Sequence, residues 1–376
     1  MTLGYHAPLP PAPTGVAEYA RDLLDALQRT QAQDTVVVGA GNAGVQLCQL
    51  GNNPLHKPAH EALERASGRK LVLLHDANLH HYYLGIRGRD AYVNEFCAQY
   101  GEWHRGFAEQ LWQERARSGS DPRYFEYAML AGVASRAGAI VVHNPEARRR
   151  VLAQAPNAEV HIVPHYFRRA HEPEPWRILD LRASLGLTGT DTLFAVFGHL
   201  RESKRVIPIL RAFARARARN PRIYLLIVGE PVSAEYARTL EFAADQQGVI
   251  RRGYLPEAEF WLYAHAVDAC INLRYPSCGE SSGIAVKLMG LGKPVLLTGG
   301  ESEFPPGSFV PVDAGPAEEE MVAEWMLLLA ADRRLRDRIG WNAANHVAKH
   351  HGLDGVAQRI WGIARSLQAA AVGRQK

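Results

Sequence analysis

The 376-residue chain is 47% hydrophobic and 22% charged, which is typical of a soluble globular protein of about two domains. Its net charge of +4 is mild, and no basic stripe or recognition motif indicates a nucleic-acid partner. The cysteines have neither CxxC nor metal-ligand spacing, and no apolar run approaches the roughly 20 residues that span a bilayer. Because the N-terminus also lacks the basic start and apolar core of a signal peptide, we expect a cytoplasmic protein, attached at most to the inner surface of a membrane.

The chain begins with a short strand candidate at 2–5 and a proline-rich loop at 8–13. A helical pattern of apolar residues follows from Val16 onward. Thr14 is positioned to cap this helix, and Gly15 would let another molecule approach the backbone where helix amides point outward. The alternative is a simple capped helix after a stiff loop.

Further strand candidates in the first half lie at 35–38, 70–74, 139–142 and 159–163. The run KLVLL at 70–74 is continuously apolar, as in a strand buried on both faces of a parallel sheet, and it ends in His75 and Asp76. Open α/β sheets bind ligands at the carboxyl ends of their strands, so His75 is a candidate functional residue, although a lone histidine is more often structural. The aromatic residues between 84 and 136 have helical spacing and indicate core helices.

A charged, proline-bearing segment at 168–176 indicates a linker, after which a second series of strands and helices begins. The predicted organisation is an N-terminal domain at 1–167, a linker at 168–190, a second domain at 191–340 and a C-terminal helical segment at 341–376. Strand candidates of the second domain lie at 193–197, 223–228, 249–253 and 269–273, and the tail at 335–368 is predicted to be helical. Alternating strands and helices predict parallel α/β organisation in both halves.

A basic loop, GHLRESKR at 198–205, follows the first strand of the second domain. Its cations, Arg201, Lys204 and Arg205, are suited to neutralise a diphosphate, lysine as a point charge and arginine by a forked contact. The alternative is an ordinary solvated loop.

The stretch LRYPSCGESSGIAVKLMGLGKPVLLT at 273–298 is predicted to form a loop, a helix starting near Ile284 and a buried strand. Ser281 or Ser282 is the expected helix cap. Amides at a helix start attract phosphate, and Glu280 just before them can accept hydroxyls of a sugar, so the loop offers groups for both halves of a sugar phosphate. The alternative is a plain strand-to-helix loop. Carboxyl ends of parallel strands share one rim, which brings this loop and the basic loop together as a predicted nucleotide-sugar site.

Four motifs, PLPPAPTGVAEYA, LHDANLHH, FGHLRESKR and LRYPSCGESSGIAVKLMGLGKPV, resemble in content and order those of the retaining glycosyltransferases of family four, especially bacterial members that assemble surface polysaccharides or glycoconjugates. The resemblance covers nearly the whole chain. It implies a GT-B fold, with two facing Rossmann-like domains of parallel sheets, an interdomain cleft, and a final helix that returns to the N-terminal domain. It also implies a nucleoside diphosphate sugar as co-substrate, a glycan, lipid-linked or small-molecule acceptor, no other cofactor and no metal, since no DxD cluster is evident.

The resemblance further implies roles for individual residues. The catalytic set it implies is His75, Asp76, Lys204 and Glu280. The substrate-binding set it implies is Gly15, Gly198, His199, Arg201, Arg205, Tyr254, Leu255, Ser281, Ser282, Gly283 and Ile284. In this pattern Lys204 helps to neutralise the leaving diphosphate, His75 contacts the transferred sugar, and Tyr254 flanks the base.

Two departures from the family pattern leave the nucleotide open. His199 stands where many relatives have arginine, and Lys287 and Leu288 stand near the position of a second glutamate that binds the ribose in relatives. The expected reaction is transfer of a hexosyl group with retention at the anomeric carbon. The alternatives are a nucleotide-sugar epimerase or phosphorylase on the same fold, and a family member that binds a sugar nucleotide without catalysis.

Overall fold

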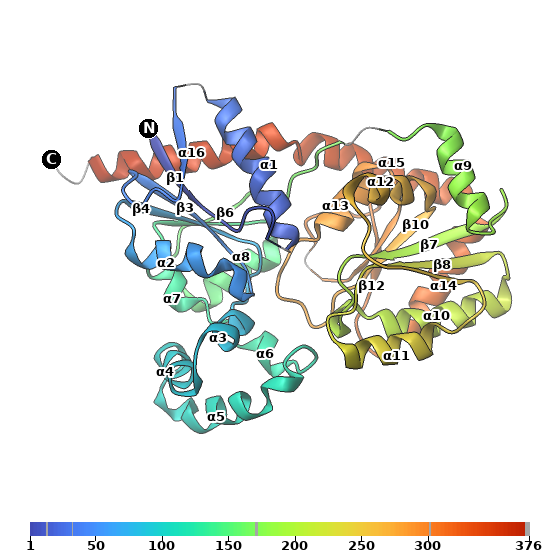
Figure 1. The fold of residues 1–376 in the computed structure, drawn as a ribbon, viewed down its shortest axis with the longest axis horizontal. Helices are drawn as coiled ribbons and strands as arrows, with labels where there is room; N and C mark the ends of the chain where they lie inside the picture. Colours follow the sequence, from blue (N-terminus) through green and yellow to red (C-terminus); the bar gives the residue numbers. More distant parts are fainter. Residues whose placement is uncertain (13, 32, 170–171, 301, 373–376) are drawn as a thin grey trace. The chain divides into compact units, whose positions relative to one another are not determined.

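The computed structural model describes residues 1–12, 14–31, 33–169, 172–300 and 302–372. The chain forms two compact units. Unit 1 comprises Met1–Tyr166, Pro276–Ser281 and the residues from His351 onward, and unit 2 comprises Phe167–Tyr275 and Ser282–His350. Each unit contains one six-stranded parallel sheet with helices on both of its faces, which confirms the predicted α/β class (Figure 1).

The sheet of unit 1 has the strand order β2-β1-β3-β4-β5-β6. Its strands are β1 (Thr2–His6), β2 (Thr35–Val38), β3 (Val45–Leu50), β4 (Arg69–Leu74), β5 (Ala139–Val142) and β6 (Val160–Ile162). Its helices are α1 (Gly15–Thr30), α2 (Lys57–Arg65), α3 (His80–Ile86), α4 (Arg89–Tyr100), α5 (Arg105–Glu114), α6 (Arg123–Glu126), α7 (Ala131–Ala134), α8 (Pro145–Gln154) and α16 (Leu353–Val372), with short 3₁₀ turns at Pro54–His56, Glu102–His104 and Arg115–Arg117. The sequence did not predict β3, because two glutamines interrupt its apolar pattern; both Gln46 and Gln49 are fully buried.

Side chains on the strands of unit 1 alternate between two hydrophobic layers. Leu71 and Leu73 of β4 join the layer that contains α1 and α16, whereas Val72 and Leu74 join the layer on the other face. Trp361 of α16 is fully buried in the first layer, and its indole Nε1 donates a hydrogen bond of 3.0 Å to Leu27 O of α1. Figure 1 shows α16, in red, beside α1, in blue. The last helix is therefore an integral part of unit 1.

The sheet of unit 2 has the strand order β12-β11-β10-β7-β8-β9. Its strands are β7 (Thr192–Phe197), β8 (Ile223–Val228), β9 (Val249–Arg252), β10 (Ala269–Asn272), β11 (Val295–Thr298) and β12 (Val310–Val312). Its helices are α9 (Pro175–Ser184), α10 (Val206–Arg219), α11 (Ala234–Ala244), α12 (Glu257–Ala266), α13 (Gly283–Gly290), α14 (Glu318–Ala331) and α15 (Arg333–His350), with a 3₁₀ turn at Glu202–Lys204.

The predicted helical tail at 335–368 is two helices rather than one. The break falls between His350 and Leu353, where Gly352 has low helix propensity. His351 at this break is buried, and its Nδ1 lies 2.6 Å from His165 O. The contact of His351 with His165 O and the low helix propensity of Gly352 together explain why α15 and α16 are separate helices.

The strand order identifies the edge of each sheet at which a ligand is expected. In a doubly wound sheet, this place is the crevice outside the carboxyl ends of the strands where the strand order reverses. The order reverses between β1 and β3 in unit 1 and between β7 and β10 in unit 2. The basic loop at 198–205 leaves β7, and the loop that leads to Glu280 leaves β10. The sheet of unit 2 thus brings the starts of both loops to its switch point.

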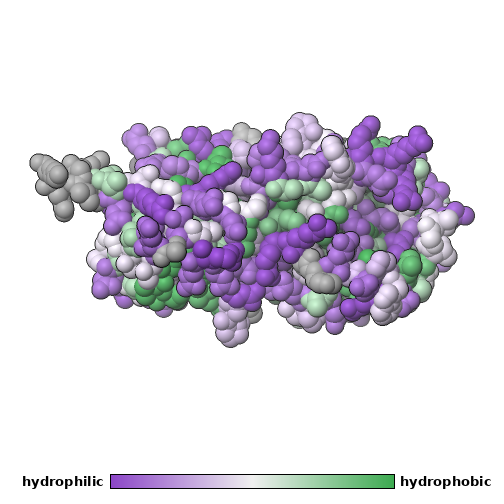
Figure 2. All heavy atoms as spheres, turned by 90° about the horizontal axis from the view of Figure 1, so that it is seen from above, coloured by the Kyte–Doolittle hydropathy of each residue, from purple (hydrophilic) through white to green (hydrophobic). Residues whose placement is uncertain are grey.

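The surface of the protein is mainly polar, with scattered apolar side chains. Figure 2 shows one face, on which hydrophilic residues predominate and hydrophobic residues form separate patches. The most exposed large apolar side chains include Trp103 in unit 1 and Phe242 in unit 2. In the part of the chain that the structure describes, the helices lack the length and apolar character that crossing a bilayer requires.

Candidate functional site

The basic loop places a buried ammonium group at the switch point of unit 2. Lys204 is only 4% exposed, and its Nζ donates a hydrogen bond to Phe197 O at the carboxyl end of β7. A Cβ atom on Gly198 would lie 2.7 Å from the same Nζ. Glycine at this position therefore lets the lysine lie directly against the backbone of the turn, where a ligand of the sheet is expected.

Arg205 and His199, in the same loop, have contrasting electrostatic surroundings. The Nε of Arg205 donates to both carboxylate oxygens of Glu318, at 2.8 and 3.2 Å, and Glu318 is 2% exposed. This ion pair balances the charge of Arg205 within unit 2. Burial, and then the charges of Lys204 and Arg201, lower the pKa of His199, so its imidazole is neutral at pH 7.

The loop that leaves β10 is joined to the basic loop and then starts a capped helix. Tyr275 N donates to Ser203 O at 2.8 Å. Ser282 is the N-cap of α13, because its Oγ accepts a hydrogen bond of 3.3 Å from Ala285 N. The predicted helix start near Ile284 is confirmed, and of the two predicted caps Ser282 is the one that the structure uses. The two loops therefore lie on one rim as far as Tyr275.

Lys287 and Leu288, the positions where a second glutamate was considered, hold a cation and a core residue. Leu288 is fully buried in the core of unit 2. The Nζ of Lys287 lies 5.3 Å from the ring centre of Phe260 and 5.5 Å from that of Trp261, the geometry of a cation–π contact. Neither position provides a carboxylate for a ribose.

A carboxylate that the sequence analysis did not select lies at the end of the neighbouring strand. Glu230 follows β8, and its Oε1 accepts a hydrogen bond of 3.0 Å from Tyr254 N. The Tyr254 side chain is 71% exposed, whereas Leu255 is partly buried. The signal that identifies Glu230 is a carboxylate directly after the buried strand and Gly229.

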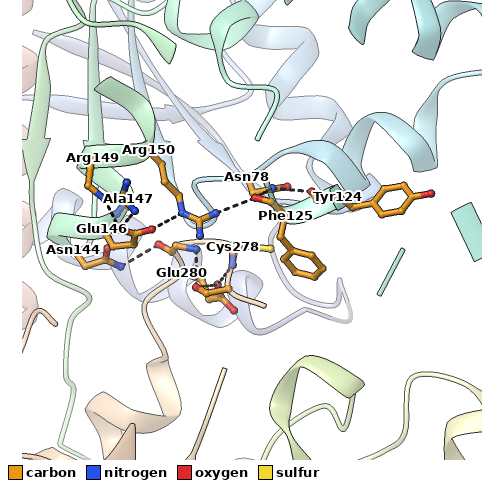
Figure 3. A network of polar contacts seen from close by, with 12 residues as sticks. Asn78, Tyr124, Phe125, Asn144, Glu146, Ala147, Arg149, Arg150, Cys278 and Glu280 are labelled. Carbon is orange, nitrogen blue, oxygen red and sulfur yellow. Dashed lines mark hydrogen bonds and ion pairs between the residues drawn. The ribbon is translucent and has the colours of Figure 1, made fainter. Parts of the chain in front are cut away.

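Glu280 lies on the segment Pro276–Ser281, which packs with unit 1 rather than with the sheet it follows. Its Oε2 accepts hydrogen bonds from Cys278 N at 2.7 Å and from Ser277 Oγ at 3.2 Å. Figure 3 shows this carboxylate folded back on its own loop, beside Asn144. Asn144 Nδ2 donates to Gly279 O at 3.1 Å and to Ser281 Oγ at 3.0 Å. The Glu280 loop is thus fixed both by its own carboxylate and by the start of α8.

A glycine is required at the tip of the Glu280 loop. Gly279 has a φ angle of +70°, which residues with a Cβ rarely adopt. An added Cβ would also lie 3.1 Å from Ala77 Cβ and 3.2 Å from Arg150 Cδ. This close approach seats the loop against the residues that follow β4.

Asn52 contacts both Asp76 and the loop that contains Glu280. Asn52 donates from its backbone N to Asp76 Oδ2 at 2.8 Å, and its Nδ2 lies 3.5 Å from Cys278 Sγ. Of the predicted catalytic residues, unit 1 therefore contains His75, Asp76 and Glu280, and unit 2 contains Lys204.

His75 follows β4 and is held by two polar contacts. Its Nε2 lies 2.9 Å from Gln49 Oε1, and its Nδ1 lies 3.4 Å from His143 Nε2. Burial, followed by the neighbouring histidines His143, His56 and His165, lowers the pKa of His75 well below its usual range. The ring of Tyr19, from α1, meets His75 edge-on with 4.8 Å between ring centres.

The start of α1 lies one helical turn before Tyr19. Thr14 caps the helix as predicted, since its Oγ1 accepts a hydrogen bond of 3.3 Å from Val16 N. An added Cβ on Gly15 would meet no atom within 4 Å, so the backbone is accessible there. The predicted open helix entrance is therefore present in unit 1.

Comparison with known proteins identifies the fold. No family model matches the chain. A sucrose-phosphate synthase from Thermosynechococcus elongatus superposes with a TM-score of 0.69 at 16% identity, over 98% of this chain and 100% of that one. Anabaena HepE in complex with UDP and glucose gives a TM-score of 0.64 at 14% identity, over 97% and 100%. WaaG, a glycosyltransferase involved in lipopolysaccharide biosynthesis, gives 0.62 at 13% identity, over 97% and 99%. The chain has the GT-B fold.

One curated protein is similar in sequence to this GT-B chain. It is the lipopolysaccharide 1,2-N-acetylglucosaminetransferase of Salmonella typhimurium, which is 28% identical over 220 residues. The match covers 54% of this chain and 56% of that protein, so the chain spans little more than half the length of this relative. The predicted resemblance to GT-B glycosyltransferases is confirmed at the level of the fold.

The contacts of Asn144 in this GT-B structure lead to a first prediction. Its Oδ1 accepts from Ala147 N at 2.7 Å and so caps α8, while its Nδ2 holds the Glu280 loop. Asn144→Asp retains the cap but replaces the two donors with an acceptor that faces Gly279 O. We expect Asn144→Asp to lower kcat/KM about tenfold, because charge-free hydrogen bonds contribute roughly 1 kcal/mol each, while the N-cap of α8 is retained.

Asn144→Ala separates the two roles, because it also removes the cap, at a cost of about 1 kcal/mol in the free energy of unfolding. Urea unfolding and steady-state kinetics measure the two effects. If Asn144→Asp and Asn144→Ala lost the same activity and had the same stability, the assignment of separate roles to Oδ1 and Nδ2 would be contradicted.

Proposed function

We propose that this protein is a retaining glycosyltransferase that moves a hexosyl group from a nucleoside diphosphate sugar to a glycan, lipid-linked or small-molecule acceptor, in bacterial surface-polysaccharide or glycoconjugate biosynthesis. The observation that carries the proposal is the switch point of unit 2, where buried Lys204 and the basic loop are joined through Tyr275 N to the loop that starts α13. The similarity to HepE, which was solved with UDP and glucose, and to the Salmonella transferase supports it.

Unit 2 is proposed to stabilise the leaving diphosphate. The Lys204 ammonium and the amides at the start of α13 would stabilise the negative charge that develops as the glycosidic bond breaks. Arg205 is the less favourable candidate for this role, because Glu318 already balances its charge. The residues supply the cation themselves, so the proposed reaction does not require a metal ion.

Unit 1 is proposed to act on the sugar and the acceptor. Glu280 would accept hydroxyls of the donor sugar, and neutral His75 would contact the transferred hexosyl group. Asp76, held by Asn52 N, would orient the acceptor or His75. Retention by front-face attack needs no protein nucleophile, because the leaving phosphate oxygen can take the proton of the acceptor hydroxyl.

The nucleoside is proposed to bind beside β8 and β9. The exposed ring of Tyr254 is available to flank the base together with Leu255. Glu230 lies beside Tyr254 and has carboxylate lone pairs left for the ribose hydroxyls, a role for which Leu288 has no polar group.

A thermal-shift screen with UDP, GDP, ADP and dTDP sugars tests the proposed donor site. A ligand at 100 times its dissociation constant stabilises the folded state by about 2.7 kcal/mol, which raises the melting temperature by a few degrees. We expect a shift with one of these nucleotides, a smaller shift for Glu230→Gln, and an unchanged shift for Glu235→Gln at an exposed position of α11. If none of the nucleotides raised the melting temperature, the proposed function would be wrong.

A further inference from the structure

A chain of hydrogen-bonding groups runs through unit 1 from one backbone carbonyl to another. Its members, in order, are Ala20 O, Tyr5 OH, the Gln49 amide, the His75 ring, the His143 ring and Val163 O. The two histidines follow the adjacent parallel strands β4 and β5, which is why their rings meet. The histidine rings, Tyr5 and Gln49 are all buried. Water is therefore a poor substitute for any missing partner along this chain.

The two ends of the chain fix the hydrogens within it. Tyr5 donates its only hydrogen to Ala20 O, so its oxygen accepts from Gln49 Nε2, and Gln49 Oε1 faces His75. The Nε2 of His75, 2.9 Å from that oxygen, must then carry a hydrogen. At the other end, His143 Nδ1 lies 2.9 Å from Val163 O and must also carry one.

The neutral side chains supply one hydrogen too few. The five contacts need five hydrogens, but Tyr5, Gln49, His75 and His143 supply one each, which makes four. The deficit falls between His75 Nδ1 and His143 Nε2, 3.4 Å apart, where two lone pairs face each other. One additional proton at this place completes the chain.

The surroundings of the two rings decide how many protons they hold. Burial lowers the pKa of His143 to about 4, and burial together with the neighbouring imidazoles lowers the pKa of His75 well below its usual range. Without a bound anion, both rings are therefore neutral at pH 7, and any proton beyond the one that each ring carries is opposed. The titratable side chains around the pair, from α1, β1, the turn after β3 and the segment after β6, are Tyr5, Tyr19, Asp22, His56, His165 and Tyr166.

Asp22 is the acidic member of these surroundings, and its Oδ2 accepts a hydrogen bond of 2.9 Å from Tyr166 OH. Two further atoms of the cluster, Tyr19 OH and His56 Nε2, are buried and have no hydrogen-bond partner among the residues that the structure describes. The Tyr19 hydroxyl can both donate and accept a hydrogen bond. The side chains around His75 therefore include polar atoms that can form further hydrogen bonds.

We propose that His75 and His143 take up one shared proton when the anionic donor binds, and that His143 acts as the positioning residue of His75. This inference rests on the proposed function, in which His75 contacts the donor sugar. The proton comes from solvent and lies between His75 Nδ1 and His143 Nε2, and no covalent bond is broken. The single positive charge complements the negative charge of the donor that His75 is proposed to contact, and the completed chain holds the His75 ring in one orientation.

Isothermal titration calorimetry with UDP and UDP-glucose at pH 7 tests the proposal. The binding enthalpy is measured in phosphate and in Tris, whose ionisation enthalpies differ, and the dependence on buffer gives the number of protons taken up. We expect about one proton per bound ligand in the unaltered protein. His161→Asn, at a half-exposed position of β6, is the matched control and should give the same number.

Two variants of His143 separate the shared proton from simple packing. His143→Gln places an amide near the position of Nε2, where its N–H can donate to His75 Nδ1 without an added charge. His143→Asn keeps a donor near Val163 O but lacks the group that faces His75. We expect both variants to bind UDP without proton uptake, and His143→Gln to retain more of the affinity for UDP-glucose.

The outcomes distinguish this inference from the proposed function. Binding of UDP to the unaltered protein without uptake, or undiminished uptake in His143→Gln, would overturn the shared proton and leave the donor site intact. If UDP did not bind, the same titration with GDP and ADP would test donor binding and proton uptake. If none of the three nucleotides bound, both the proposed function and the inference would be overturned.

Discussion

Replacing Lys204 with methionine is expected to lower kcat at least about a hundredfold. The ammonium lies at the switch point of unit 2, against Phe197 O and Gly198, and it is 4% exposed. Solvent screens a buried charge only weakly, so its interaction with a bound anion is strong. In comparable sites, loss of one preorganised donor lowers the rate by a factor of about 10²–10³. Methionine fills a similar volume, so the variant removes the charge without opening a cavity. Steady-state kinetics with a competent donor and acceptor measure the effect.

A matched control for this variant is Arg211→Met on α10. Arg211 carries the same charge in the same unit, but it is exposed and paired with Glu319. We expect its kcat to stay within about twofold of the original value, because exposed ion pairs contribute little. Full activity in Lys204→Met would show that the leaving group is stabilised elsewhere.

Glu280→Ala should lower kcat/KM about ten- to a hundredfold, because a hydrogen bond to a charged group contributes roughly 1.5–3 kcal/mol. The carboxylate has two functions in this account. It accepts from Cys278 N and Ser277 Oγ and so shapes its loop, and it is proposed to bind hydroxyls of the donor sugar. The alanine variant loses both functions, and kinetics with varied donor concentration measure the combined loss.

Glu280→Gln distinguishes the two functions. The amide oxygen can still accept from Cys278 N, so the loop should keep its conformation while the charge is lost. We expect an intermediate kcat/KM and an unchanged melting temperature. If glutamine kept full activity while alanine lost it, Glu280 would serve only to shape the loop.

The sequence predicted the elements whose pattern is local. Continuous apolar runs such as 70–74 and 193–197 gave buried strands, and Thr14 and Ser282 gave helix caps, because each signal depends on near neighbours. It did not predict β3, whose glutamines are satisfied by distant partners: Gln49 binds Tyr5 and His75, which lie 44 and 26 residues away. Buried polar strands become recognisable only when those partners are known.

The residues of the site were partly predicted for the same reason. The position after a buried strand made His75, and the basic loop that contains Lys204, candidates for the site, but the pairing of His75 with His143 depends on the adjacency of β4 and β5. Glu280 was expected on the rim of the second sheet, whereas its loop packs with unit 1 through Asn144 and Gly279. Arg205 was expected to face a diphosphate, and its partner Glu318 lies 113 residues further along the chain. These contacts follow from topology rather than from local pattern.

The central claim is glycosyl transfer with retention from a nucleoside diphosphate sugar. NMR spectroscopy of the reaction of an α-linked donor with a panel of glycan acceptors tests it most directly, since the anomeric proton coupling of the product reports its configuration. We expect an α-linked product, and nucleoside diphosphate release that requires the acceptor. A β-linked product, or release of the nucleoside diphosphate at the same rate without acceptor, would contradict it.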